Sequence, residues 1–171
     1  RMKAVLALGF NSDKSITPRL IDYLDSKNQS DISDIDFDLI LRLVLSLGHL
    51  ANAGDERALD YLLKLCSPTR WQNNGSPFNF AKNKPLKSHP LYVFLLDGLS
   101  RSGSKEALLL FKTFDFGLLE EPLCNYMKTD IIRFYDQCAF IQQNGIDCTI
   151  DLPAIGRKKA EAYLEAHDQD E

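Results

Sequence analysis

Three aspartates at alternate positions, Asp34, Asp36 and Asp38, imitate the start of a calcium-binding loop, in which alternate carboxylates surround a hard cation. The rest of the loop pattern is missing. Its sixth position requires glycine but holds Leu39, and its twelfth requires a bidentate glutamate but holds Leu45. We therefore interpret the three carboxylates as the charged first turn of a helix, where they complement the helix dipole.

Gly98-x-x-x-x-Gly103-Ser104-Lys105 resembles a phosphate-binding loop, but serine and lysine stand in the wrong order. A helical pattern, not a strand, precedes it. We expect no nucleotide site here, and interpret Gly98 as the end of a helix and Gly103 as a turn residue.

The three histidines, His49, His89 and His167, are far apart and form no H-E-x-x-H motif, which disfavours a metal enzyme. The four cysteines lack a C-x-x-C pair and the dense spacing of a secreted disulfide scaffold, so reduced thiols in a cytoplasmic protein are expected. Cys138, near Phe134 and Ile141, is interpreted as a small buried hydrophobe. No catalytic residue, metal or cofactor is predicted.

Residues 68–89 are polar and basic, with four basic residues and no acidic one. We predict that this insertion binds a protein partner, with tryptophan and arginine as anchors and the lysines attracting an acidic surface. The alternative is that the aromatic side chains fold the loop back over the core. The candidate binding residues of this loop are Arg70, Trp71, Phe78, Phe80, Lys82, Lys84 and Lys87.

The elements that must position these residues repeat along the chain. In residues 4–9, 43–48 and 93–98 an apolar run ends in glycine, and a second helical pattern follows in residues 17–24, 55–62 and 104–111. Thr17, Asp55 and Ser104 stand where a helix N-cap is expected. Each unit is therefore predicted to be a helical hairpin.

The second unit should bury one stripe on each of its helices. We expect its first helix to begin near Asp36. The predicted buried residues of the first helix are Leu39, Ile40, Leu43, Val44, Leu47 and Leu50, and those of the second helix are Leu59, Leu62, Leu63 and Cys66.

Two further elements are expected after the third unit. Residues 122–144 should form a degenerate fourth hairpin that ends at Asn144-Gly145. Residues 157–167 should form a short helix before a frayed acidic end.

These units resemble the HEAT-like repeats of phycobilisome-lyase-type proteins, with Arg1, Ala4, Ala7, Leu8, Gly9 and Asp13 in the first unit and Leu47, Gly48, Asp55, Ala58, Leu59 and Leu62 in the second. The third unit departs from the pattern, with Asp97 before its glycine and Ser104 at the acidic position. The resemblance covers roughly residues 1–114. It implies an all-α superhelix, a HEAT/armadillo-like solenoid of about three to four hairpins, and it identifies architecture better than activity.

In such a superhelix the second helices line a concave docking surface. Arg57, Tyr61 and Lys64 of the second unit are therefore the remaining candidate binding residues. An ordinary solvated face with favourable charge pairs is the alternative.

The 171 residues, 44% of them hydrophobic, suffice for one HEAT-like domain over residues 1–150, with the loop at 68–89 and a separate C-terminal segment at 151–171. No apolar run approaches the length of a membrane span, and the net charge of −4 disfavours nucleic acid as a partner. The first residues resemble the second half of a helix already begun, which suggests a piece of a longer chain.

We therefore predict a cytoplasmic scaffold or adaptor without catalytic activity that binds a protein partner. One alternative is an enzyme or enzyme subunit, as in HEAT-like lyases and DNA glycosylases. Another is a regulatory or oligomerisation domain of a larger protein.

Overall fold

The computed structural model describes residues 13–27, 33–74, 88–119 and 121–146, and these are helical with no strand among them. The all-α prediction is thereby confirmed. The predicted helices at residues 4–9 and 157–167 lie outside the described residues. The elements are η1 (Lys14–Ile16), α2 (Thr17–Lys27), α3 (Asp34–Asn52), α4 (Glu56–Cys66), η2 (Pro68–Asn74), α5 (Ser88–Ser100), α6 (Lys105–Lys112), η4 (Phe116–Leu118) and α7 (Glu121–Asn144).

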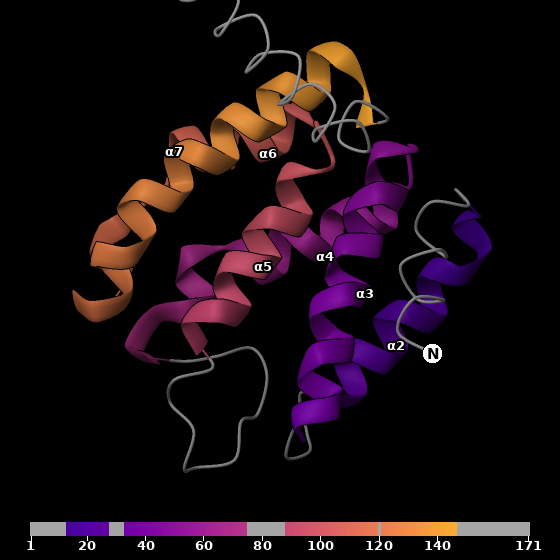
Figure 1. Ribbon diagram of the computed structural model, residues 1–171, viewed down its shortest axis with the longest axis horizontal. Coiled ribbons are helices and arrows are strands. Elements are labelled where there is room, and N and C mark those ends of the chain that lie inside the picture. The colour runs from indigo at the N-terminus through magenta and orange to yellow at the C-terminus, as the bar shows by residue number, and fades with distance from the viewer. Residues whose placement is uncertain (1–12, 28–32, 75–87, 120, 147–171) are drawn as a thin grey trace, which may run out of the picture.

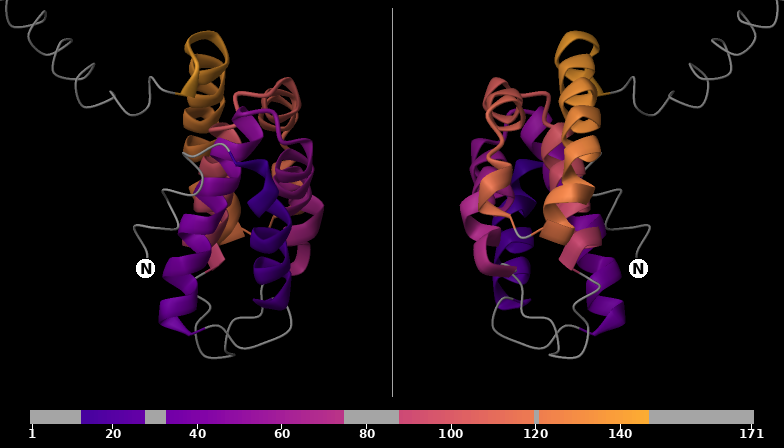
Figure 2. Two further views of the ribbon diagram at one scale, coloured as in Figure 1. Left: turned by 90° about the vertical axis from the view of Figure 1, so that its right-hand side faces the viewer. Right: turned by 90° about the vertical axis from the view of Figure 1, so that its left-hand side faces the viewer.

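The helices form two layers (Figures 1 and 2). Helices α3, α5 and α7 lie in one layer, in which α5 packs against α3 on one side and α7 on the other. Helices α2, α4 and α6 form the second layer, and α4 packs against both α3 and α5. Each of the hairpins α3–α4 and α5–α6 therefore contributes one helix to each layer, and the core lies between the layers.

Two of the three expected helix caps are present. The Asp55 carboxylate accepts a hydrogen bond from the Arg57 backbone N–H at 3.0 Å, and the Ser104 hydroxyl accepts one from the Ala107 N–H at 3.0 Å. The Thr17 cap was wrongly predicted. Thr17 has helical backbone angles (φ −52°, ψ −46°), because the turn η1 runs directly into α2 and Asp13 caps that turn instead.

Helix α3 begins at Asp34, two residues before the expected start, and Ser33 caps it by accepting a hydrogen bond from the Asp36 N–H at 3.1 Å. The predicted stripe is largely buried. Leu39, Leu59 and Leu63 are only partly buried, because they lie at the edges of their helix faces. No helix in the described part of the chain is long and apolar enough to cross a membrane.

Residues 122–144 were wrongly predicted to form a hairpin, because they belong to the single 24-residue helix α7. Its buried residues follow one another at intervals of four and three, which gives one continuous stripe and leaves no place for a turn. The helix ends as expected, since Gly145 has a φ of +81° and donates a hydrogen bond to the Ile141 carbonyl at 2.7 Å. The buried stripe consists of Met127, Ile131, Phe134, Cys138 and Ile141.

Gly98 does not end its helix, which corrects the sequence interpretation. Gly48 and Gly98 lie inside α3 and α5 where the two helices cross, and a Cβ atom on Gly48 would overlap the Gly98 carbonyl. A Cβ atom on Gly98 would lie 2.7 Å from Val44 Cγ1 and 2.7 Å from the Val44 carbonyl oxygen. Both glycines are therefore required for close approach of the backbones. Gly103 is a turn residue as expected, with a φ of +59°.

Candidate binding surfaces

The structure separates the two anchors predicted in the basic loop. Trp71 is only 1% exposed, its ring stacks on Tyr92 with centroids 4.2 Å apart, and its Nε1–H donates to the Leu65 carbonyl at 2.8 Å. This is the core-packing alternative, so Trp71 is not an exposed partner anchor. Arg70 is exposed. The loop residues Phe78, Phe80, Lys82, Lys84 and Lys87 lie outside the described residues.

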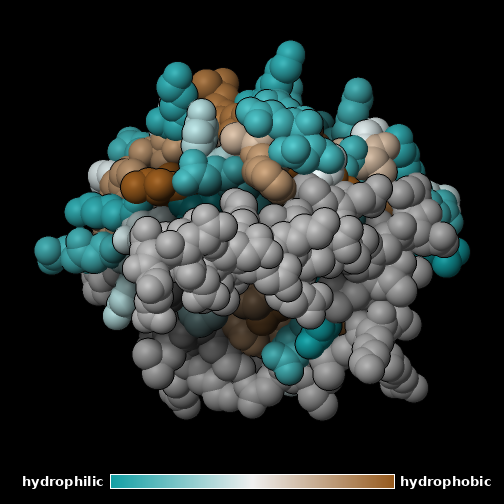
Figure 3. All heavy atoms as spheres, turned by 45° about the horizontal axis from the view of Figure 1, so that its top comes forward, coloured by the Kyte–Doolittle hydropathy of each residue, from teal (hydrophilic) through white to brown (hydrophobic). Residues whose placement is uncertain are grey.

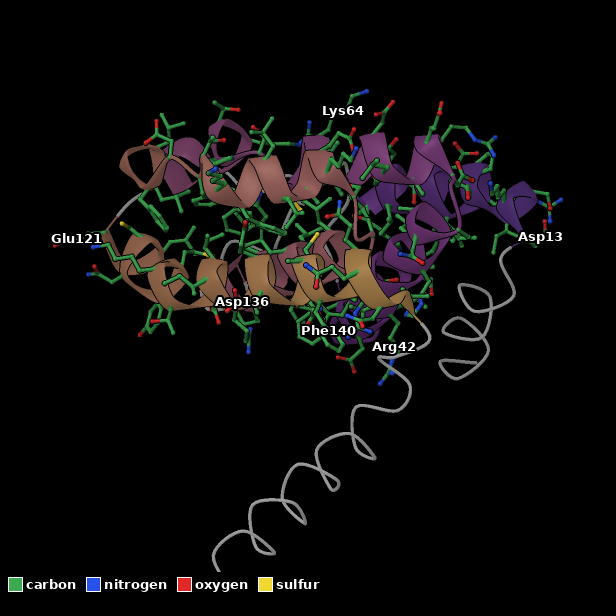
Figure 4. The ribbon with its side chains drawn as sticks, turned by 90° about the horizontal axis from the view of Figure 1, so that it is seen from above. Asp13, Arg42, Lys64, Glu121, Asp136 and Phe140 are labelled. Carbon is green, nitrogen blue, oxygen red and sulfur yellow. The ribbon has the colours of Figure 1, made fainter. Side chains whose placement is uncertain are left out.

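The second-helix residues mainly connect parts of the fold. Arg57 pairs with the Asp55 carboxylate at 3.2 Å and donates to the Lys14 carbonyl at 3.0 Å. The Tyr61 hydroxyl donates to Asp25 at 2.7 Å, which joins α4 to α2, and burial followed by this carboxylate raises the pKa of Tyr61. Lys64 is exposed at the outer edge of the second layer, as Figure 4 shows. Arg57 and Lys64 are therefore both exposed, whereas Tyr61 is partly buried.

Asp36, the middle residue of the aspartate run, connects two helices. Asp36 accepts hydrogen bonds from the Tyr23 hydroxyl at 2.9 Å and the Ser33 hydroxyl at 2.8 Å, and it pairs with Lys27 at 3.0 Å. The hydrogen bond from Lys27, followed by those from Ser33 and Tyr23, lowers the pKa of Asp36 to about 2. Asp36 therefore links α2 to the first turn of α3, as a charged group near a helix N-terminus does.

Two of the thiols lie deep in the core. Cys66 and Cys138 are both 0% exposed, whereas Cys124 is partly exposed. Burial raises the pKa of the Cys66 thiol well above its ordinary value and raises that of Cys138 to about 12. The interpretation of Cys138 as a buried hydrophobe is confirmed. Among the described residues, no group of three or more histidine, cysteine or acidic side chains is placed to hold a metal ion.

Alkylation of the native protein at pH 8 should modify Cys124 at least about tenfold faster than Cys66 or Cys138, because only the thiolate is nucleophilic and burial disfavours it. Peptide mass spectrometry after timed iodoacetamide treatment measures the three rates, and the unfolded protein in guanidinium serves as the control in which they should converge. Equal labelling of Cys138 and Cys124 in the native state would contradict the packing of α7.

A groove of about 310 Å³ lies between α5 and α7 on the outer side of the first layer. Its lining includes Phe94, Asp97 and Arg101 of α5 and Arg133, Phe134 and Gln137 of α7. In Figure 4, Phe140 of α7 and Arg42 of α3 project from this side of the molecule, and Lys64 projects from the opposite side.

A polar network joins the two helices that border this groove. The Gln137 amide donates to Asp97 at 2.8 Å and to the Ser100 hydroxyl at 2.7 Å, so it ties α7 to α5. Arg101 pairs with Asp97 at 3.2 Å, while its buried Nε has no hydrogen-bond partner among the described residues.

Arg133 borders the same groove from α7. Its guanidinium lies 4.7 Å from the centroid of the Phe134 ring and 3.0 Å from Asp130, and its side chain is 59% exposed. Phe140, two turns further along α7, is 39% exposed. Arginine and aromatic side chains are the residue types that dominate the energy of protein interfaces.

The exposed large apolar side chains in the described residues all lie on α6 and α7, and sequence analysis missed them as a group. Figure 3 shows apolar groups among hydrophilic ones at this end of the molecule. The available signal was that Ile132, Tyr135 and Phe140 fall outside the spacing of the buried stripe of α7. The group consists of Leu109, Tyr126, Ile132, Tyr135 and Phe140.

Comparison of the chain with protein-family models, with characterised proteins and with solved structures finds no match in any of the three. The function of the chain is therefore inferred from the geometry of these surfaces.

Proposed function

We propose that the chain is a HEAT-like superhelical scaffold without catalytic activity that binds a protein partner, and that it works in the cytoplasm. Its support is the alternation of hairpin helices between two layers, which is the way stacked helical repeats share one core. The free thiols of Cys66, Cys124 and Cys138 favour a reducing compartment.

The observation that carries the binding proposal is the α5–α7 groove with its arginine and phenylalanine side chains. Phe94 and Phe134 offer an apolar floor, and Arg133 offers an exposed guanidinium at its edge. A partner segment with an apolar side chain and a neighbouring carboxylate or backbone carbonyl would cover the floor and accept a hydrogen bond from Arg133. A protein segment can present both groups.

The charges of the groove favour protein over nucleic acid. Arg101 is paired with Asp97, and Arg133 with Asp130, so each described arginine of the groove is compensated by a carboxylate. Phosphate backbones require an excess of positive charge. A lyase or glycosylase activity therefore finds less support in this surface than protein binding does.

Charge reversal on opposite layers tests the proposal. We expect Arg133→Glu to reduce recovery of a specific partner at least about tenfold, because it removes a guanidinium at the groove and places a carboxylate near Asp97 and Asp130. Lys64→Glu is the matched control, since it makes the same charge change on the second layer. Affinity capture with quantitative mass spectrometry compares the intact chain with both variants, and the affinity of the recovered protein is then measured after purification.

The pair of variants also separates the two candidate surfaces. Loss of capture with Lys64→Glu and its retention with Arg133→Glu would overturn the groove proposal and assign binding to the second-helix face. Retention by both variants would contradict both surfaces. Circular dichroism should show that both variants remain helical, since both side chains are exposed.

A further inference from the structure

The alternation of layers leaves one position without a described helix. In each described hairpin a first-layer helix is followed by a second-layer helix, α4 after α3 and α6 after α5. Helix α7 belongs to the first layer, and the described residues end soon after it, at Ile146. The next second-layer position lies beside α6 and α7 at the end of the stack, which faces the viewer in Figure 4.

The surface at that position is an apolar groove of about 320 Å³ between α6 and α7. Phe111 of α6 and Ile131 of α7 form its floor, and Ile132 and Tyr135 form its α7 side. Ile132 is 65% exposed, and Tyr135 is 37% exposed. A helix packed here would remove these side chains from water, as α4 does for the apolar faces of α3 and α5.

The chain contains one segment of suitable pattern after α7. In residues 157–167, Ala160, Tyr163, Leu164 and His167 stand at positions i, i+3, i+4 and i+7, which places them on one face of a helix. Ala162 stands on the opposite face. The segment therefore has the amphipathic pattern of the second helices α4 and α6.

We propose that residues 157–167 dock as a helix in the α6–α7 groove, so that the chain caps its own stack. The ten residues 147–156 can span roughly 33 Å when extended, whereas Ile132 lies roughly 18 Å along α7 from its end at Asn144. The connection is therefore long enough for an antiparallel return along α7.

Charges at the groove suit this occupant. Glu161 and Glu165 are one helical turn apart on one flank of the segment. Lys112 lines the groove on the α6 side, and Lys128 lies one turn from Ile132 on the α7 side. Whether Glu161 and Glu165 face α6 or α7, they lie on the side of a lysine, Lys112 on α6 or Lys128 on α7. A second copy of the chain offers no such complementarity at this end, because the two lysines would repel their counterparts.

A matched pair of substitutions in the full chain tests the docking. Methyl-labelled protein should show NMR cross-peaks between Leu164 and Ile132 that persist on dilution. Ala160→Glu should abolish them and should increase hydrogen exchange of the amides around Ile132 at least about tenfold, because it buries a charge on the docking face. Ala162→Glu, the same change on the opposite face, should leave the cross-peaks in place.

Two outcomes would overturn the proposal. The first is an absence of Leu164–Ile132 cross-peaks in the intact chain. The second is cross-peaks that arise only between differently labelled molecules, which would assign the groove to a second copy. The proposed partner site lies on the other flank of α7, so loss of capture with Arg133→Glu does not depend on either result.

Discussion

Replacement of Gly48 by alanine should destabilise the fold by about 2 kcal/mol, although alanine is the better helix former by about 1 kcal/mol. The added Cβ would overlap the carbonyl of Gly98 on the facing helix, so α3 and α5 would have to move apart along their whole contact. Overpacking of this kind costs typically about 1–3 kcal/mol, and more where the obstacle is backbone. Chemical denaturation followed by circular dichroism measures the change.

Gly145→Ala provides the control for this substitution. Gly145 also has an unusual backbone angle, a φ of +81°, but a Cβ atom there would meet nothing within 4 Å. Gly145→Ala should lower the free energy of unfolding by about 1 kcal/mol, because alanine disfavours this backbone conformation. A neutral or stabilising Gly48→Ala would show that the two helices do not cross at the glycines.

Trp71→Ala should destabilise the protein by about 3–5 kcal/mol, because it empties a fully buried site. It removes the ring stacked on Tyr92 and leaves the buried Leu65 carbonyl without its donor. Trp71→Phe keeps a ring against Tyr92 and should therefore lower the free energy of unfolding by less than Trp71→Ala does. Trp71 is the single tryptophan of the chain, so its substitution removes the tryptophan fluorescence. Guanidinium unfolding of the variants is therefore followed by circular dichroism.

Arg70→Ala is the natural control for Trp71, because the two residues are neighbours and Arg70 is exposed. Its unfolding free energy should change by less than about 0.5 kcal/mol. Similar losses for Arg70→Ala and Trp71→Ala would contradict the burial of Trp71. The contrast also means that a Trp71 variant reports on folding, so partner binding by this region should be tested through Arg70 alone.

Structural features that depend on neighbouring residues, such as helix caps and helix ends, could be predicted well from the sequence. Asp55 and Ser104 act as caps because their side chains satisfy N–H groups two and three residues away, which needs no distant partner. Gly145 stops α7 for a similarly local reason. The buried stripe of α3 also follows from residue spacing, since an apolar face must find cover wherever the helix packs.

Features that depend on a second element could not be predicted in this way. The sequence shows a glycine near the end of an apolar run, which is typical of a helix stop. Whether Gly98 ends α5 or instead allows the backbone of α3 to pack closely against α5 depends on where α3 lies. Thr17 has the residue type of a cap, yet the preceding turn η1 makes it part of the helix. Residues 122–144 were predicted to form a hairpin because the sequence does not show which apolar residues of α7 are buried and which, like Ile132, are exposed.

The sequence by itself determined that the described part of the chain is helical, roughly where the helices α3, α4 and α6 begin, and that no motif for metal or nucleotide chemistry is complete. These properties depend on contacts within one or two helical turns. Only the tertiary structure decided that Trp71 belongs to the core and that Arg101, Arg133 and Phe134 share a groove. Such properties depend on which faces of α4, α5 and α7 meet, and packing between residues far apart in the chain sets that choice.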